Sequence, residues 1–167
     1  MRDLASKTVV GLIATLLIAA CAAPTKRVAA SDSQVLLVCE HGNVKSLMAA
    51  SYFNQVASER GLPFRAVSRG TAPDSTTVPP VIVSGLRGDG FDVAAFQPVA
   101  VDAADVTASR RVILINTALP ANAQVAGVES EQWSDVPPAT ADYAAARAAL
   151  KLHIERLIGD LENSVPR

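Results

Sequence analysis

Short apolar segments alternate with amphipathic segments along most of this chain. The amphipathic segments repeat their apolar side chains every three or four residues, which predicts helices, whereas the apolar runs predict buried strands. The predicted strands are 34–38, 64–68, 111–115 and 125–129. The predicted helices are 46–60, 79–88, 102–108 and 140–163. This order predicts an α/β domain, in which a parallel sheet carries helices on both faces.

The last helix has a start signal of its own. Thr140 is predicted to cap this helix, because a hydroxyl at that position accepts a hydrogen bond from a free backbone N–H. Asp142 then lies in the first turn, where the helix dipole favours a negative charge.

The chain begins with a segment that does not fit this alternation. Residues 8–20 form an apolar run that is shorter than the ~20 residues a spanning helix needs, and it is typical of an export signal. The letters Ile18-Ala19-Ala20-Cys21 resemble a bacterial lipobox, in which the cysteine receives lipid and becomes the new N-terminus. Ordinary cleavage nearby and a retained membrane anchor are the alternatives.

The domain organisation follows from these boundaries. We predict a lipoprotein signal peptide over 1–20, a flexible tether over 21–33 and a single domain over 34–163. No aspartate follows Cys21, which in the usual sorting rule favours the outer membrane. We therefore expect an exported protein, held by the lipid on Cys21 at the periplasmic face of the outer membrane of a bacterial cell envelope.

Charge excludes one class of partner. Fifteen Lys and Arg residues stand against 16 Asp and Glu residues, and no basic run is present. A protein that follows a phosphate backbone needs such a run, so no nucleic-acid partner is expected.

The two cysteines, Cys21 and Cys39, raise a further question. An exported chain usually pairs its cysteines, yet lipid on Cys21 would leave Cys39 unpaired. Cys39 is then either a small buried hydrophobic residue or a reactive thiol.

The residues after Cys39 favour a reactive thiol. Cys39 ends the first predicted strand, and ligands bind at the carboxyl ends of parallel strands. The following loop consists of Glu40, His41, Gly42, Asn43 and Val44, after which a helix begins. Backbone N–H groups in such a loop, together with the helix dipole, bind anions such as phosphate. Gly42 and Asn43 are residue types that tolerate the positive φ needed to close the loop.

Two side chains at the start of the helix complete the predicted site. Lys45 supplies a cation that neutralises a bound anion, and Ser46 supplies a hydroxyl that donates to Cys39. A thiolate near a cation and a helix N-terminus is the nucleophilic form of cysteine.

On these residues the chain resembles the low-molecular-weight protein tyrosine phosphatases and the arsenate reductases that share their fold. The resemblance rests on Val38-Cys39, five further residues, Lys45-Ser46 and then Met48-Ala49, and it extends over most of 34–163. It implies a three-layer domain with a four-stranded parallel sheet. It also implies that Cys39 attacks phosphorus and that water then releases the cysteinyl-phosphate. We expect neither a metal nor a cofactor.

This sequence departs from the family pattern in its loop cation. The family has Arg where this chain has Lys45, and Arg grips two phosphoryl oxygens with a planar fork. Loss of a well-placed transition-state donor costs roughly 3–4 kcal/mol, a factor of ~10²–10³ in rate.

A second departure concerns the general acid. The segment 133–138 resembles the family's Asp-Pro loop, but Pro137 occupies the position of the acid. Asp135 is the nearest substitute, with an ordinary loop residue as the alternative, whereas Asp142 fits the first turn of a helix better. A missing acid typically costs ~10²–10⁴-fold in rate.

Three other side chains are weighed for a role. His41 is able to hold a proton, although histidines in such loops more often shape the loop or face solvent. Trp133 is predicted to pack in the core, with a stacking wall for an aryl phosphate as the alternative. His153 has no predicted role.

Three functions remain. The first is a slow hydrolase for phosphotyrosine or small aryl phosphates. The second is a binding module that holds phosphate or another oxyanion without turnover. The third is arsenate reduction. Thr117 or Ala118 stands where a resolving cysteine is expected, so this reaction would need an external thiol.

Overall fold

The computed structural model describes residues 33–164. The predicted signal peptide, the lipid site at Cys21 and all but the last residue of the tether lie outside this range. The elements, in chain order, are β1 (Gln34–Cys39), α2 (Lys45–Glu59), β2 (Arg65–Gly70), α3 (Pro80–Gly88), α4 (Ala103–Thr107), β3 (Arg111–Ile115), the 3-10 helix η1 (Ala121–Ala123), β4 (Glu131–Trp133) and α5 (Tyr143–Ser164). Within 33–164, no helix is long and apolar enough to cross a membrane.

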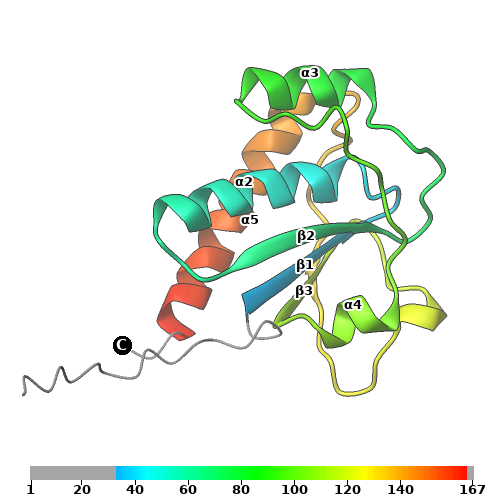
Figure 1. Cartoon of the computed structure of the whole chain (residues 1–167), viewed down its shortest axis with the longest axis vertical. Coiled ribbons are helices and arrows are strands. Elements are labelled where there is room, and N and C mark those ends of the chain that lie inside the picture. Colours follow the sequence, from blue (N-terminus) through cyan, green and yellow to red (C-terminus); the bar gives the residue numbers. More distant parts are fainter. Residues whose placement is uncertain (1–32, 165–167) are drawn as a thin grey trace, which may run out of the picture.

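The four strands form one parallel sheet in the order β2-β1-β3-β4. Helices α2, α3 and α5 lie on one side of the sheet, and α4 lies on the other (Figure 1). The sheet therefore has helices on both faces, and the predicted three-layer α/β fold with a four-stranded parallel sheet is confirmed.

The core has two parts, because the central strands are buried on both faces. Leu37 and Ile113 face the cluster formed with α2 and α5, where Phe53, Leu150 and Ile158 are fully buried. On the opposite face, the smaller cluster contains Leu36, Val38, Val106, Val112 and Leu114. Because helices cover both faces of the sheet, a central strand buries side chains on both of them. The central strands therefore have continuous apolar sequences, without alternation of apolar and polar residues.

The fourth strand was predicted wrongly. The chain turns at 126–127, where Gly127 has φ +80°, so the apolar residues near it do not form a strand. The strand is Glu131–Trp133, which pairs with β3 and buries only Trp133. A short edge strand with two exposed residues has little apolar pattern to predict it.

The predicted start of the last helix was also wrong. Residues 139–141 form a turn, in which the Ala141 N–H donates to the Pro138 carbonyl over 3.1 Å. Helix α5 begins at Tyr143, and Asp142 Oδ1 accepts a hydrogen bond from the Ala145 N–H at 2.9 Å. Asp142, not Thr140, therefore caps the helix.

A polar cluster ties α3 to α2 and α5. Asp89, directly after α3, accepts hydrogen bonds from the Tyr52 hydroxyl at 2.6 Å and from the Tyr143 hydroxyl at 2.7 Å. Arg147 forms an ion pair with the same carboxylate at 2.9 Å. Burial raises the pKa of Asp89, but the two hydroxyl donors and the charges of Arg147 and Lys151 outweigh burial, so the net pKa is lowered.

We expect Asp89→Ala to lower the free energy of unfolding by about 2–4 kcal/mol at neutral pH, because two partly buried hydroxyls, of Tyr52 and Tyr143, lose a charged acceptor. Urea denaturation measures this loss. Since the folded-state pKa of Asp89 is lowered, its contribution is present above the unfolded pKa of about 3.9 and is lost as pH falls through the folded-state value.

The matched control is Asp160→Ala, which removes an exposed carboxylate from α5 and is expected to change stability by less than about 0.5 kcal/mol. Equal losses in the two variants would contradict the role of Asp89.

Candidate active site

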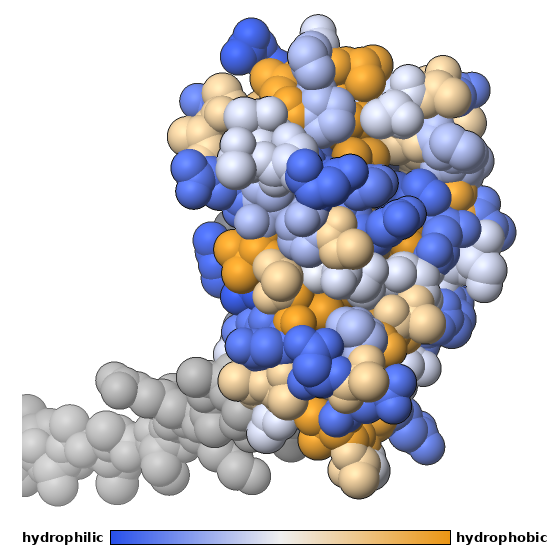
Figure 2. Space-filling model, turned by 90° about the vertical axis from the view of Figure 1, so that its right-hand side faces the viewer, coloured by the Kyte–Doolittle hydropathy of each residue, from blue (hydrophilic) through white to orange (hydrophobic). Residues whose placement is uncertain are grey.

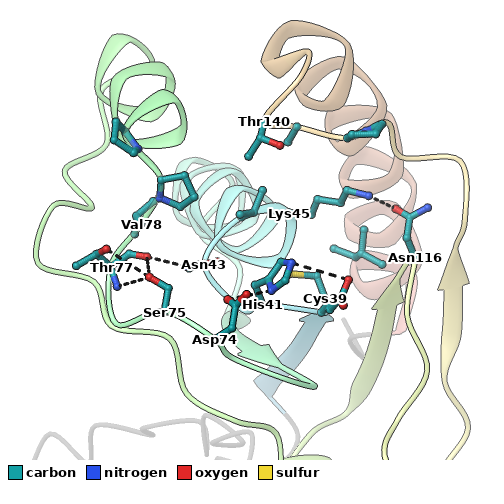
Figure 3. A pocket seen from close by; sticks show the side chains of 17 residues that line it. Cys39, His41, Asn43, Lys45, Asp74, Ser75, Thr77, Val78, Asn116 and Thr140 are labelled. Atoms are coloured by element: carbon teal, nitrogen blue, oxygen red, sulfur yellow. Dashed lines mark hydrogen bonds and ion pairs between the residues drawn. The ribbon is translucent and has the colours of Figure 1, made fainter.

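A cavity of about 580 Å³ lies at the carboxyl ends of the strands. Its wall comes from the β1–α2 loop, the β2–α3 segment, the end of β3 and residues 138–140 (Figure 3). Figure 2 views the molecule from the side of these strand ends, where hydrophilic and hydrophobic residues are interspersed. Within 33–164, no group of three or more His, Cys, Asp or Glu side chains is placed to hold a metal ion.

Cys39 contributes to this cavity from the last position of β1. The residue is 4% exposed, and its sulfur lies 3.0 Å from Ser46 Oγ. The Gly42 N–H also donates to the sulfur over 3.3 Å. The structure thus brings together the predicted nucleophile and the predicted hydroxyl donor, and two donors of this kind suit a thiolate.

Ser68 extends this contact into a chain of two buried hydroxyls. Its Oγ lies 2.8 Å from Ser46 Oγ and 2.8 Å from the Gly42 carbonyl oxygen. Ser46 Oγ has a further acceptor, the Arg69 carbonyl, at 3.3 Å. Each hydroxyl has one proton to give, so Ser68 is able to donate to Ser46 while Ser46 donates to sulfur. Sequence reasoning missed Ser68. A small polar residue at a buried position of a predicted strand is the feature that could have identified it.

The β1–α2 loop packs closely against the end of β2, because a glycine lies at the contact on each side. Gly42 has φ +76°, as predicted, and a Cβ there would lie 2.6 Å from the Gly70 nitrogen. A Cβ on Gly70 would lie 2.8 Å from the His41 carbonyl carbon. A side chain at either position would therefore push the loop off the end of β2.

Asn43 has a different role from the one predicted. Among residues 33–164, Asn116 is the non-glycine residue with positive φ, so Asn43 does not close the loop in that way. Its side chain is buried instead, and its Nδ2 donates to the Thr77 carbonyl over 2.6 Å. This bond ties the loop to the β2–α3 segment, so that the two walls of the cavity are joined.

The N-terminus of α2 offers free donors to the cavity. Its cap, Val44, makes no side-chain hydrogen bond, and the first turn contains no acidic residue. The first N–H groups of a helix have no partner within the helix, and they carry the positive end of its dipole. This end of α2 is therefore suited to an anion.

Lys45 lies in the cavity wall, and its ammonium group points toward Asn116 (Figure 3). Nζ donates to Asn116 Oδ1 at 2.7 Å and to the Val136 carbonyl at 3.1 Å. An ammonium group has three protons, so one remains for a bound anion. Burial lowers the pKa of Lys45, whereas the charges of Cys39 and Glu40 act in the opposite direction.

Asn116 was also missed from the sequence. It directly follows β3 with φ +51°, and its Nδ2 donates to the Ser134 carbonyl at 2.7 Å. Its amide thus links Lys45 to the segment after β4. The feature that could have identified Asn116 is an asparagine directly after a buried strand. Asparagine adopts positive φ more readily than most residues.

Asp135 is not brought to Cys39. Its carboxylate lies 2.6 Å from His153 Nε2, and it is absent from the cavity wall. The hydrogen bond to His153 lowers the pKa of Asp135. His153 stacks on Trp133 at 4.6 Å between ring centroids, and Trp133 is 1% exposed. Trp133 therefore packs in the core as predicted, and the geometry gives Asp135 a structural partner in place of the predicted acid role.

His41 lies in the cavity between two carboxylates. Its Nδ1 is 3.1 Å from Asp74 Oδ1, and its Nε2 is 3.9 Å from Glu40 Oε2. Asp74 lines the same cavity from the β2–α3 segment. Sequence reasoning missed Asp74, because a carboxylate in a loop carries no specific signal.

Comparison with known proteins supports the fold. No family model matches this sequence, and no curated protein matches it. Solved structures do match, among them a thioredoxin-dependent arsenate reductase from Corynebacterium glutamicum, with TM-score 0.67 and 20% identity over 83% of this chain and 66% of that one. An arsenate reductase from Archaeoglobus fulgidus matches with TM-score 0.61 and 23% identity, over 75% of this chain and 98% of that one.

A low-molecular-weight protein tyrosine phosphatase from T. tengcongensis matches with TM-score 0.58 and 20% identity, over 77% of this chain and 99% of that one. The chain thus has the fold that these phosphatases and arsenate reductases share, as the loop motif implied.

Proposed function

We propose that this protein is a cysteine-dependent phosphatase that hydrolyses phosphotyrosine or small aryl phosphates through a cysteinyl-phosphate. One observation carries the proposal: Cys39 lies in a cavity beside the uncapped N-terminus of α2, with donors at 3.0 and 3.3 Å from its sulfur. This arrangement combines an activated nucleophile with an anion site. Phosphatases among the proteins of the same fold support the assignment.

The reaction needs two steps. The Cys39 thiolate attacks phosphorus, the S–P bond forms and the P–O bond to the leaving group breaks. Water then attacks phosphorus, the S–P bond breaks, and inorganic phosphate and the thiolate are released. Ser46 donates to the thiolate when it leaves, while N–H groups at the start of α2 and the third proton of Lys45 hold the phosphoryl oxygens.

We expect slow hydrolysis of phenyl phosphate by the wild-type protein and no hydrolysis above background by Cys39→Ser, because the substituted hydroxyl lacks the nucleophilicity of a thiolate. Release of phosphate measures the rate, and trapping of a phosphorylated protein by rapid acid quench tests for the intermediate.

The control is Ser33→Ala, which lies outside the cavity wall and is expected to leave the rate unchanged. Full activity in Cys39→Ser would exclude the covalent mechanism.

A second candidate function is an oxyanion-binding module without turnover. Two observations favour it: two protons of Lys45 are already engaged, and Asp135 is bound to His153. Anion binding would survive both features, whereas transition-state stabilisation and leaving-group protonation would suffer.

Lys45→Arg distinguishes the two functions. We expect this substitution to raise kcat/KM for phenyl phosphate by about 10-fold or more, because a guanidinium group presents a planar fork to two phosphoryl oxygens. No gain, together with tight binding of vanadate by the wild-type protein, would favour the binding module.

Arsenate reduction is the third candidate. The fold neighbours include arsenate reductases, but the whole chain has only Cys21 and Cys39, and Cys39 is the free cysteine within 33–164. Thr117, near the position of a resolving thiol, is placed with its hydroxyl 3.2 Å from that of Thr71. Reduction would therefore depend on an external thiol.

The site is proposed to act outside the cytoplasm. We propose export by the segment 1–20 and lipidation at Cys21, which would hold the domain at the periplasmic face of the outer membrane; the lipobox-like letters before Cys21 support this. Intact-mass spectrometry of the mature protein is expected to show a chain that begins at Cys21 with added acyl mass. An unmodified chain that begins at Ala23 would refute lipidation.

A further inference from the structure

Phosphate ester cleavage leaves one requirement unassigned, which is a proton for the departing oxygen. Asp135 is engaged by His153 and absent from the cavity wall, and Asp142 caps α5 through the Ala145 N–H. Neither carboxylate that the sequence offered is therefore placed to act. A proton donor must come from side chains that line the cavity.

Five titratable side chains line the cavity: Cys39, Glu40, His41, Lys45 and Asp74. Cys39 is the nucleophile in the proposed reaction. The Lys45 ammonium group donates to Asn116 and Val136, and its proposed role is to supply positive charge to the bound anion. Glu40 and Asp74 are each 69% exposed at their side chains. A carboxylate in water is ordinarily ionised at neutral pH and has no proton to donate. His41 remains, and imidazole both gives and takes protons near neutral pH.

The environment of His41 fits this task. Its Nδ1 is buried without an aligned hydrogen bond, yet lies 3.1 Å from Asp74 Oδ1, while 41% of the side chain is exposed. Figure 3 shows the ring beside Cys39, with Asp74 on its other side. Nδ1 thus faces the Asp74 carboxylate, which is placed to orient the ring. Nε2, 3.9 Å from Glu40 Oε2, is the nitrogen left to exchange a proton with a ligand.

We propose that His41 is the catalytic general acid and base of this site and that Asp74 is its positioning residue; this rests on the phosphatase function proposed above. In the first step, Cys39 forms the S–P bond, the P–O bond breaks, and imidazolium His41 gives its Nε2 proton to the departing oxygen. In the second step, neutral His41 takes a proton from the attacking water, the O–P bond forms, and Cys39 leaves as a thiolate.

The test compares two substrates that differ in their need for a proton. Phenoxide leaves poorly without one, whereas 2,4-dinitrophenoxide leaves as a stable anion. The measured quantity is kcat/KM, which reports formation of the cysteinyl-phosphate. For His41→Gln we expect a loss of about 10²-fold with phenyl phosphate and little change with 2,4-dinitrophenyl phosphate.

Two further variants sharpen the result. Asp74→Asn is expected to show the same leaving-group pattern with a smaller loss, because it removes only the partner of Nδ1. Asp160→Asn, an exposed carboxylate on α5, is the matched control and is expected to match the wild type with both substrates.

The pH dependence of kcat/KM tests the role of His41 directly, because a residue with a purely structural role would not change it. Because His41 must be protonated in the first step, kcat/KM for phenyl phosphate is expected to fall toward alkaline pH. This fall should disappear in His41→Gln. Circular dichroism and vanadate binding establish that each variant folds with its cavity formed.

Equal losses with both substrates in His41→Gln would overturn the proposal, and so would a loss specific to phenyl phosphate in Asp135→Asn. Failure of the phosphatase function itself looks different. In that case the wild-type protein hydrolyses neither substrate, or Cys39→Ser retains activity with both.

Discussion

The site depends on the contact between two backbones, the β1–α2 loop at Gly42 and the end of β2 at Gly70. Either glycine, given a Cβ, would meet backbone atoms of the other segment at less than 3.0 Å. Because the two segments approach so closely, the Gly42 N–H reaches the Cys39 sulfur and the Gly42 carbonyl reaches Ser68 Oγ. The Cys39 sulfur, the Gly42 N–H and the start of α2 therefore have a fixed geometry, which a side chain at either glycine would disrupt.

Charge is divided across the cavity. Lys45 and the N-terminus of α2 supply positive potential, whereas Glu40 and Asp74 supply negative charge next to His41. An oxyanion is attracted to the first group, and a proton to the second. Lys45 divides its protons between Asn116 and Val136, and its ammonium group does not present the planar fork of an arginine.

The local pattern was sufficient for most of the fold. Strand 111–115 and the helices after Cys39 and Pro79 were found within a residue or two of their observed bounds, because apolar periodicity reflects which face is buried. The strand at 131–133 was misplaced, because a short edge strand buries only Trp133 and is selected by its pairing with β3. Thr140 was taken for a cap because a turn at 139–141 leaves no periodic signal.

The sequence by itself determined a thiol at the end of a buried strand, a loop closed by Gly42 and a helix that begins at a cation and a hydroxyl. These residues are neighbours in the chain, so their spacing carries the geometry. Tertiary structure alone decided the partners: Ser46 with Ser68, Lys45 with Asn116, and Asp135 with His153. Those pairs lie 22, 71 and 18 residues apart, and only the packing of separate elements brings their polar atoms within hydrogen-bonding distance.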